Sequence, residues 1–260
     1  MMENKPNSKP CIALMGEFSA GKSTLANLML GASPLPVQVI ATRLPPVRIS
    51  YGTSPAARMD LEGRSHPIDL ADLANIPLAS TQLIQIFRRD EILRQCDIID
   101  MPGISDPNMD VDVWPRVLPF AHAVIWCSHA TQAWRQSEAA FWDQMPKEIQ
   151  ERSILLLTRI DKIAAESDRH RLMQRVLREA GEQFSTCLPI ALLDAHSAGT
   201  DQIRWQASGA AAFADAFVYM VERTKAELAG EAWIGQLAKE PQPIPERPKI
   251  VPRRVTRYAG

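Results

Sequence analysis

Cysteine is scarce in this sequence and is not arranged for disulfides or metal binding. The 260 residues contain four cysteines, and no two of them form a C-x-x-C pair. The five histidines show no H-E-x-x-H or comparable ligand spacing. All four cysteines fall in apolar segments expected to be strands, so we predict buried thiols in a reducing compartment, without a disulfide framework or a structural metal. They are Cys11, Cys96, Cys127 and Cys187.

Long apolar runs are also missing. No stretch approaches the roughly eighteen residues of a membrane-spanning helix. The polar residues 1–9 lead into a short apolar run that enters a glycine-rich loop at once, so we expect no signal peptide and a cytoplasmic protein. The formal net charge of −1 gives no reason to expect a nucleic-acid partner.

The most informative feature that is present is GEFSAGKST at residues 16–24, called here the 16–24 loop. It fits G-x-x-x-x-G-K-[ST], follows the apolar run CIALM and opens a helical segment. Gly16 and Gly21 would let backbone N–H groups face phosphates, while Lys22 neutralises the terminal phosphates and Ser23 binds Mg²⁺. The alternative is a chance glycine-rich turn, which the strand-to-helix context disfavours. We predict a nucleotide-binding site that involves Gly16, Glu17, Phe18, Ser19, Ala20, Gly21, Lys22, Ser23 and Thr24.

A second motif is CDIIDMPG at residues 96–103. It is an apolar strand that ends in Asp100 before a Pro-Gly turn. The carboxylate there can hold a water on Mg²⁺, and the amide of Gly103 can face the terminal phosphate. By itself such a strand end is common. Its position after a phosphate-binding pattern favours a role at the same site.

A third segment, ILLLTRID at residues 154–161, brings Thr158, Arg159 and Asp161 to the end of a buried-type strand. It resembles the base-reading T-K-x-D of dynamin-type GTPases. The resemblance implies that the carboxylate accepts hydrogen bonds from guanine, and hence GTP rather than ATP. Arg159 departs from the usual Lys, and the two are not interchangeable. A salt-bridged strand end remains the alternative.

The segment ATRLPPVRIS at residues 41–50 resembles the first switch of the same family. In that family the Thr corresponding to Thr42 completes the Mg²⁺ shell, and its backbone positions the attacking water. A turn residue in a proline-rich loop is the alternative interpretation.

The interior of the 16–24 loop narrows the resemblance to bacterial dynamin-like proteins, whose pattern GEFS-[SA]-GKST-L-x-N-x-L-L-G it follows. The resemblance implies that Ser19 helps to hold K⁺ or Na⁺ in place of an arginine finger. Phe18 stands where eukaryotic members carry a polar residue, and Ile104 follows DMPG, so we expect slow basal hydrolysis of GTP to GDP. The resemblance also implies that Ser197 and Ala198 supply backbone donors to guanine. The implied catalytic residues are Ser19, Lys22, Thr42, Asp100 and Gly103, with Ser23, Thr42 and Asp100 at the metal.

Strands that alternate with helices predict an α/β P-loop NTPase fold, a doubly wound, mainly parallel sheet with helices on both faces. The apolar residues 121–130 predict a strand buried on both faces. Residues 84–89 are a strand candidate, although residues 80–83 could equally begin a helix. We expect helices at 134–145, with Trp134, Ala140 and Phe141 on one face, and at 167–185, with Ser167 as N-cap.

We divide the chain into a flexible N-terminus at 1–9, a dynamin-type GTPase domain at 10–228, a helical extension at 229–240 and a tail at 241–260. The Ala-rich helical residues 201–229 are either the last helix of the domain or the start of a dynamin neck. The tail has five prolines and a net charge of +4, so we expect it to be extended. It is either simply solvated or docks on an acidic partner or an anionic membrane surface.

Two function classes remain open. The first is a GTPase activated when two copies form a homodimer across the nucleotide face. The second is a nucleotide-switched binding module for a partner such as a stalk-bearing dynamin-like protein or a ribosomal particle. At 28.9 kDa the chain is too short for the stalk and membrane-binding tip of dynamin-type mechanoenzymes. The short length favours the second class more strongly than the motifs of the chain do.

Overall fold

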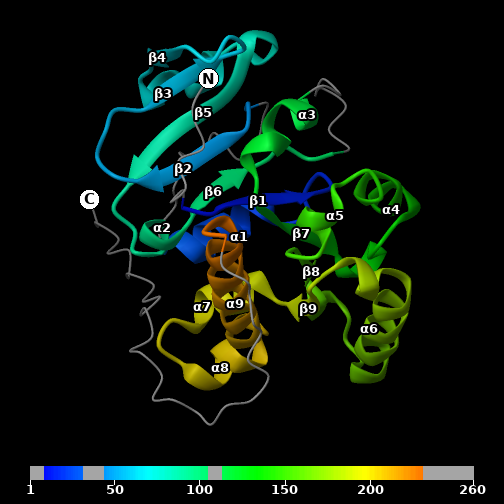
Figure 1. Cartoon of the computed structure of the whole chain (residues 1–260). Helices are drawn as coiled ribbons and strands as arrows, with labels where there is room; N and C mark the ends of the chain where they lie inside the picture. The colour runs from blue at the N-terminus through cyan, green and yellow to red at the C-terminus, as the bar shows by residue number, and fades with distance from the viewer. Residues whose placement is uncertain (1–8, 32–43, 105–112, 231–260) are drawn as a thin grey trace.

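The computed structural model describes residues 9–31, 44–104 and 113–230 (Figure 1). Within them a nine-stranded sheet has the order β4-β3-β5-β2-β6-β1-β7-β8-β9. The strands are β1 (Cys11–Gly16), β2 (Val47–Tyr51), β3 (Ala57–Asp60), β4 (Ser65–Pro67), β5 (Thr81–Arg88), β6 (Asp97–Asp100), β7 (Ala123–His129), β8 (Ile154–Thr158) and β9 (Thr186–Ile190).

Most neighbouring strands run parallel. β6, β1, β7, β8 and β9 form one parallel block, and β2 is parallel to β5. Antiparallel pairs join β2 to β6, β3 to β5 and β3 to β4. The predicted mainly parallel sheet is confirmed. β5 begins at Thr81, so the alternative of a helix from residues 80–83 is wrong.

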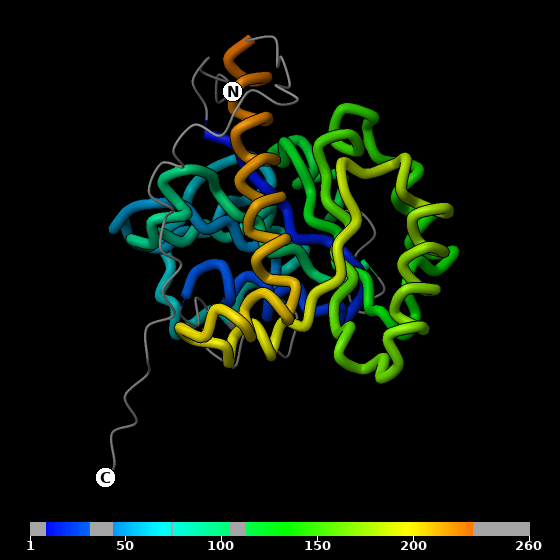
Figure 2. Tube along the Cα trace, turned by 90° about the horizontal axis from the view of Figure 1, so that it is seen from below, coloured from blue at the N-terminus to red at the C-terminus, as the bar shows by residue number. Residues whose placement is uncertain are grey.

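Helices cover both faces of the sheet. α1 (Lys22–Leu30), α2 (Ile92–Gln95), α7 (Leu192–Ala198), α8 (Gln202–Ala207) and α9 (Ala210–Leu228) belong to one side. α3 (Val113–Val117), α4 (Gln136–Trp142), α5 (Lys147–Gln150) and α6 (Glu166–Ala180) belong to the other. In Figures 1 and 2, α9 (orange) and α6 (yellow-green) stand apart on either side of β9. Short 3₁₀ helices are η2 (Leu70–Asn75), η3 (Leu78–Ser80), η4 (Leu118–Phe120), η5 (Ala130–Gln132), η6 (Ile160–Lys162) and η7 (Gly181–Gln183).

Each face of the sheet has its own hydrophobic core. On the α1 and α9 side, Ile12, Leu14 and Leu25 are fully buried, and β1 supplies the first two of them. On the α4 and α6 side, Trp126 of β7 packs against Trp142 with ring centroids 5.3 Å apart. β7 therefore faces a core on both sides, as its largely apolar sequence predicts.

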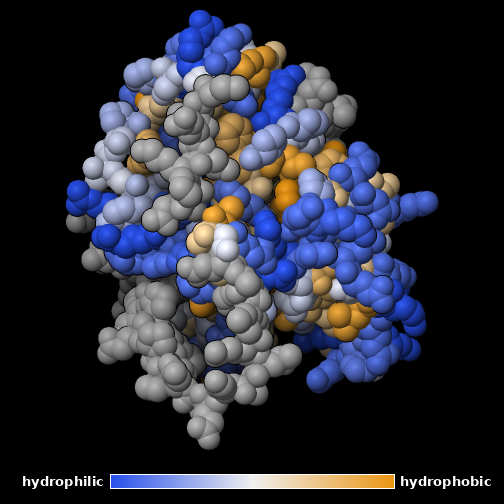
Figure 3. Space-filling view, in the orientation of Figure 1, coloured by the Kyte–Doolittle hydropathy of each residue, from blue (hydrophilic) through white to orange (hydrophobic). Residues whose placement is uncertain are grey.

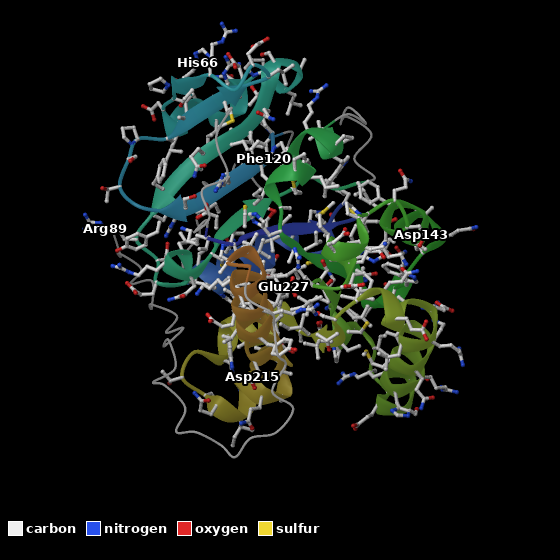
Figure 4. The ribbon with its side chains drawn as sticks, viewed as in Figure 1. His66, Arg89, Phe120, Asp143, Asp215 and Glu227 are labelled. Atoms are coloured by element: carbon white, nitrogen blue, oxygen red, sulfur yellow. The ribbon has the colours of Figure 1, made fainter. Side chains whose placement is uncertain are left out.

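α9 packs its apolar side onto the sheet. Phe213, Phe217 and Met220 are buried in the core beside α1. Glu227, labelled in Figure 4, pairs with Arg152 and Arg223, which ties the end of α9 to the turn before β8. This packing supports the interpretation of residues 201–229 as the last helical part of the domain. The domain boundaries themselves stay predictions, and residues 231–260 lie outside the described residues.

Two helix predictions need correction. α6 begins at Glu166 with Ala165 as its N-cap, so Ser167 lies inside the helix and does not cap it. α4 begins at Gln136, after Trp134, which is buried in a left-handed conformation with φ of 54°. Ala140 is exposed, so it does not share the buried face of α4. Periodicity misled here because the buried tryptophan belongs to the turn before the helix.

Hydrophilic side chains dominate the surface over two of the helices, and the thiols are buried. In the view of Figure 3, hydrophilic side chains cover most of the surface over α4 and α6. All four cysteines are buried free thiols, as predicted, although Cys96 lies just before β6 rather than in a strand. Within the ranges that the structure describes, no helix is long and apolar enough to cross a membrane.

Candidate functional site

The 16–24 loop joins the end of β1 to the start of α1 at the carboxyl edge of the parallel strands. Gly16, Ser19 and Gly21 have φ of 135°, 59° and 93°. Positive φ values at three positions of so short a loop let its backbone N–H groups turn to one side, which is typical of a concavity suited to an anion. A Cβ atom at Gly16 would lie 2.0 Å from the carbonyl oxygen of Cys127 on β7. Glycine at this position is therefore required by both space and conformation.

Lys22 closes this concavity from the first turn of α1. Its Nζ donates to the carbonyl oxygens of Gly16 at 3.1 Å and Glu17 at 2.7 Å, and the residue is buried. The ammonium group therefore lies within the curve of the loop, where it could neutralise a phosphate. Phe18 is 59% exposed, so it projects from the loop into solvent rather than into a core.

Ser23 and Asp100 meet beside the loop. The Ser23 hydroxyl donates to Oδ2 of Asp100 at 3.0 Å, because β6 lies next to β1 and brings Asp100 level with Leu14. Asp100 Oδ1 is buried and has no hydrogen-bond partner among the described residues. Burial raises the pKa of Asp100, while Lys22 and the Ser23 hydroxyl oppose that rise. An unsatisfied carboxylate oxygen beside a hydroxyl fits Mg²⁺, which prefers oxygen ligands.

The turn after β6 packs directly on the 16–24 loop. The backbone N–H of Ile104 donates to the Gly16 carbonyl oxygen at 3.2 Å. A Cβ atom at Gly103 would lie 2.7 Å from both N and Cα of Phe18. The turn could therefore respond to any ligand that moves the loop. Thr42 lies outside the described residues, so its predicted role at Mg²⁺ and the attacking water stays a prediction.

The end of β8 contacts the loop from the other side. Thr158 is fully buried, and its Oγ1 donates to the Ala20 carbonyl oxygen at 2.8 Å. Arg159 has φ of 55°, and its guanidinium donates to the Ser19 carbonyl oxygen at 3.2 Å. Asp161 lies in η6, where its ion-pair partner is the adjacent Lys162 at 3.5 Å. That ion pair joins neighbours in sequence and does not bridge two elements. The salt-bridge alternative therefore gives no structural reason for an aspartate at position 161.

The structure places Ser197 and Ala198 inside α7 rather than in a loop. The Ser197 hydroxyl donates to the Leu193 and Asp194 carbonyl oxygens within the same helix. The residue after β9 that does approach the 16–24 loop is Leu192, whose Cδ1 would lie 3.1 Å from a Cβ at Gly21. A guanine contact by Ser197 and Ala198 stays a prediction, and their helical setting gives it no support.

Sequence reasoning missed two residues that hold the loop. The Glu17 carboxylate accepts a hydrogen bond from Arg135 Nη1 at 3.0 Å and from Ser137 Oγ at 2.7 Å. Both donors lie where β7 leads into α4. The periodicity of this segment predicts a helix but gives no sign of a contact with the 16–24 loop. The available signal was a basic residue and a hydroxyl at the start of a helix that follows a buried strand.

Comparisons with known proteins identify the family of the chain. The sequence model of the Dynamin family matches residues 12–160, which include the 16–24 loop, Asp100 and Thr158. "Dynamin-like protein 2" of Campylobacter jejuni subsp. jejuni serotype O:23/36 (strain 81-176) is 29% identical over 161 residues, or 60% of this chain. Those residues are 26% of the relative, so the matched part of this chain spans about a quarter of that protein's length.

Among solved structures, two of an oligomerised bacterial dynamin pair, described as a mechanism for long-range sensing and tethering of membranes, superpose with a TM-score of 0.59. Each is 20% identical and covers 86% of this chain; the chain covers 36% of one and 37% of the other. At this identity the likeness establishes the α/β P-loop NTPase fold. Because the family match extends over more than half of the chain, this protein belongs to the dynamin family of GTP-binding proteins.

Proposed function

We propose that this chain hydrolyses GTP to GDP and phosphate. The observation that carries the proposal is the convergence of two separate segments, the ends of β6 and β8, on the 16–24 loop. Asp100 reaches Ser23 at 3.0 Å, and Thr158 reaches the Ala20 carbonyl oxygen at 2.8 Å. Phosphoryl transfer needs a cradle for the phosphates, a metal site and a base-recognition edge in one place, and catalysis then rests on positioning and charge.

The residues of the loop would bind the phosphates. Backbone N–H groups of the left-handed loop face them, and Lys22 exchanges its bonds to the Gly16 and Glu17 carbonyl oxygens for bonds to phosphate. Ser23 and Asp100 would hold Mg²⁺, which neutralises charge that develops on the phosphate oxygens. Asp161 would accept hydrogen bonds from guanine, and the Arg159 guanidinium, held at Ser19, would border the base.

The attacking water needs a further group. Ile104 follows Gly103, so the side chain at that position cannot orient water. Thr42 is the candidate for this role, and Ser19, at its left-handed position in the loop, is the candidate for holding K⁺ or Na⁺. Pairing of two copies across the nucleotide face would order both groups around the water. The relatives' description as an oligomerised pair supports such pairing, with a second copy or another dynamin-like chain as partner.

The test measures GTP hydrolysis against protein concentration in K⁺, in Na⁺ and in a buffer without either. We expect activity per molecule to rise with concentration and to need one of the cations. Light scattering in GDP, a GTP analogue and GDP with aluminium fluoride should show a dimer in the last state.

Lys22→Ala should lower GTP affinity on the order of 100-fold, because charge-assisted bonds to phosphate are lost. Lys147→Ala on the exposed side of α5 is the matched control and should bind normally. A monomer in all nucleotide states, with GTP binding but no turnover, would favour the nucleotide-switched binding module. Unchanged GTP affinity in Lys22→Ala would contradict the site itself.

A further inference from the structure

Glu17 is held from outside the loop at both of its carboxylate oxygens. Oε2 accepts from Arg135 Nη1 at 3.0 Å, and Oε1 accepts from Ser137 Oγ at 2.7 Å. The Glu17 side chain is 16% exposed, whereas that of Arg135 is 44% exposed. Two bonds from different donors fix the direction of a carboxylate as well as its distance. The side chain of Glu17 is therefore turned toward the start of α4.

The two donors stand on a rigid base. The backbone N–H of Arg135 donates to Oε2 of Glu138 at 3.0 Å. Glu138 is buried and also accepts from Trp126 Nε1 at 2.9 Å and Ser128 Oγ at 3.0 Å. The backbone N–H of Trp134 donates to that same Ser128 hydroxyl at 3.1 Å. The turn that carries Arg135 is thus fixed to β7, a strand in the interior of the sheet.

The main chain of Glu17 is part of the phosphate cradle. Its carbonyl oxygen accepts from Lys22 Nζ at 2.7 Å and from the Ala20 N–H at 3.2 Å. Ser19 and Gly21, close by in the loop, are in left-handed conformations. Such a loop, with a strained non-glycine residue, needs surrounding contacts to keep its shape without a ligand. The carboxylate of Glu17 supplies one contact that reaches from the loop to another element.

We propose that Arg135 and Ser137 clamp Glu17 and thereby hold the 16–24 loop in its phosphate-binding shape before the nucleotide arrives. The side chains of Glu17, Arg135 and Ser137 act as positioning groups, because they hold the loop and not the phosphate. The expected effect of the clamp on GTP affinity rests on the proposed function, but the shape of the loop can be measured without any nucleotide. Without the clamp, only a fraction of molecules would present the cradle, and the apparent dissociation constant rises in inverse proportion to that fraction.

The first measurement is hydrogen exchange of the nucleotide-free protein. Glu17→Ala and Arg135→Ala should each speed the exchange of the amides of residues 17–21 about tenfold, while the amides of β8 keep their protection. Arg171→Ala is the control, because Arg171 forms an ion pair with Asp168 on exposed α6. If exchange of residues 17–21 is the same in Glu17→Ala, Arg135→Ala and the wild type, the clamp does not exist.

The second measurement is the affinity for a fluorescent GTP analogue. Arg135→Ala should weaken binding about tenfold, with kcat changed less than about twofold, since bound phosphate restores the loop. Glu17→Ala should weaken binding by at least as much. The double variant should be no weaker than Glu17→Ala, because the loss of the Glu17 carboxylate already removes the bond to Arg135. Arg135→Lys keeps the charge but not the planar fork and should recover part of the affinity. Additive losses, or a loss of kcat with unchanged affinity, would overturn the clamp.

The two proposals fail in different ways. A wild-type protein that binds no GTP contradicts the proposed function, while hydrogen exchange still decides whether the clamp holds the loop. A wild type that binds GTP, with single variants that match its exchange and affinity, contradicts the clamp alone.

Discussion

Replacing Gly16 by alanine tests how tightly the loop is built into the sheet. At this position φ is 135°, and an added Cβ would lie 2.0 Å from the Cys127 carbonyl oxygen and 3.0 Å from its carbonyl carbon. The obstacle is backbone of β7, which is paired with β1 along its length and cannot rotate away. Relief therefore requires the loop and the end of β1 to move off β7.

The cost has two parts. A non-glycine residue in a sparsely populated left-handed conformation costs about 1–3 kcal/mol. Overpacking against a fixed wall costs about 1–3 kcal/mol more. We expect Gly16→Ala to lose about 2–6 kcal/mol of the roughly 5–15 kcal/mol that stabilise a domain. GTP binding should fall further, because the Gly16 carbonyl oxygen holds both Lys22 and the Ile104 N–H.

Gly63 provides the matched control. Its φ is 79°, and nothing lies within 4 Å of an added Cβ. Gly63→Ala thus carries only the conformational cost of about 1–2 kcal/mol. Urea unfolding of both variants, followed by far-UV circular dichroism, separates that cost from the clash. If Gly16→Ala is no less stable than Gly63→Ala, the close approach of the loop to β7 is wrong.

Other contacts determine stability, nucleotide affinity and thiol reactivity in ways that can be measured. Thr158→Val removes the bond to the Ala20 carbonyl oxygen and should cost about 1–2 kcal/mol in thermal unfolding while weakening GTP binding; unchanged affinity would separate β8 from the site. Asp161→Asn should weaken GTP about tenfold but not ATP in competition titrations, because an amide cannot accept both guanine donors. Iodoacetamide at pH 8 should label the native thiols only on unfolding, since burial raises the pKa of Cys11, Cys96 and Cys127 to about 12 and that of Cys187 to about 11. Because these values lie above the unfolded value of 9.0, stability is full below pH 9 and should fall as the pH rises through 9 toward 12, which melting temperatures at pH 8 and pH 10 would check.

Local patterns predicted the parts of the fold that depend on local chemistry. The glycine positions of the 16–24 loop follow from backbone freedom that other residues lack. The apolar residues 121–130 indicated a strand buried on both faces because both faces of β7 are covered. Each of these features can be identified from a window of about ten residues.

Features that depend on tertiary contacts were ambiguous or missed. Residues 84–89 were a strand candidate, but residues 80–83 could equally have begun a helix, and pairing with β2 and β3 selects the strand β5. The turn at Trp134 is stabilised by rings from elsewhere, including Trp126 at 6.3 Å between centroids. The apolar pattern of the sequence places Trp134 in the helix. It contains no information about the ring contacts that hold Trp134 in the turn instead.

The candidate site divides in the same way. Gly16, Lys22, Ser23 and Asp100 were predicted together because their chemistry imposes a spacing within each motif. Glu17 and Arg135 are 118 residues apart, and no spacing rule links a loop after β1 to a turn after β7. Their meeting follows from the strand order β6-β1-β7, which places the end of β7 beside the loop that leaves β1. A parallel sheet collects its strand ends at one edge, so the residue after each strand becomes a neighbour of the site whatever its place in the sequence. The groups that support a phosphate loop are therefore best sought at the ends of the two strands that flank it.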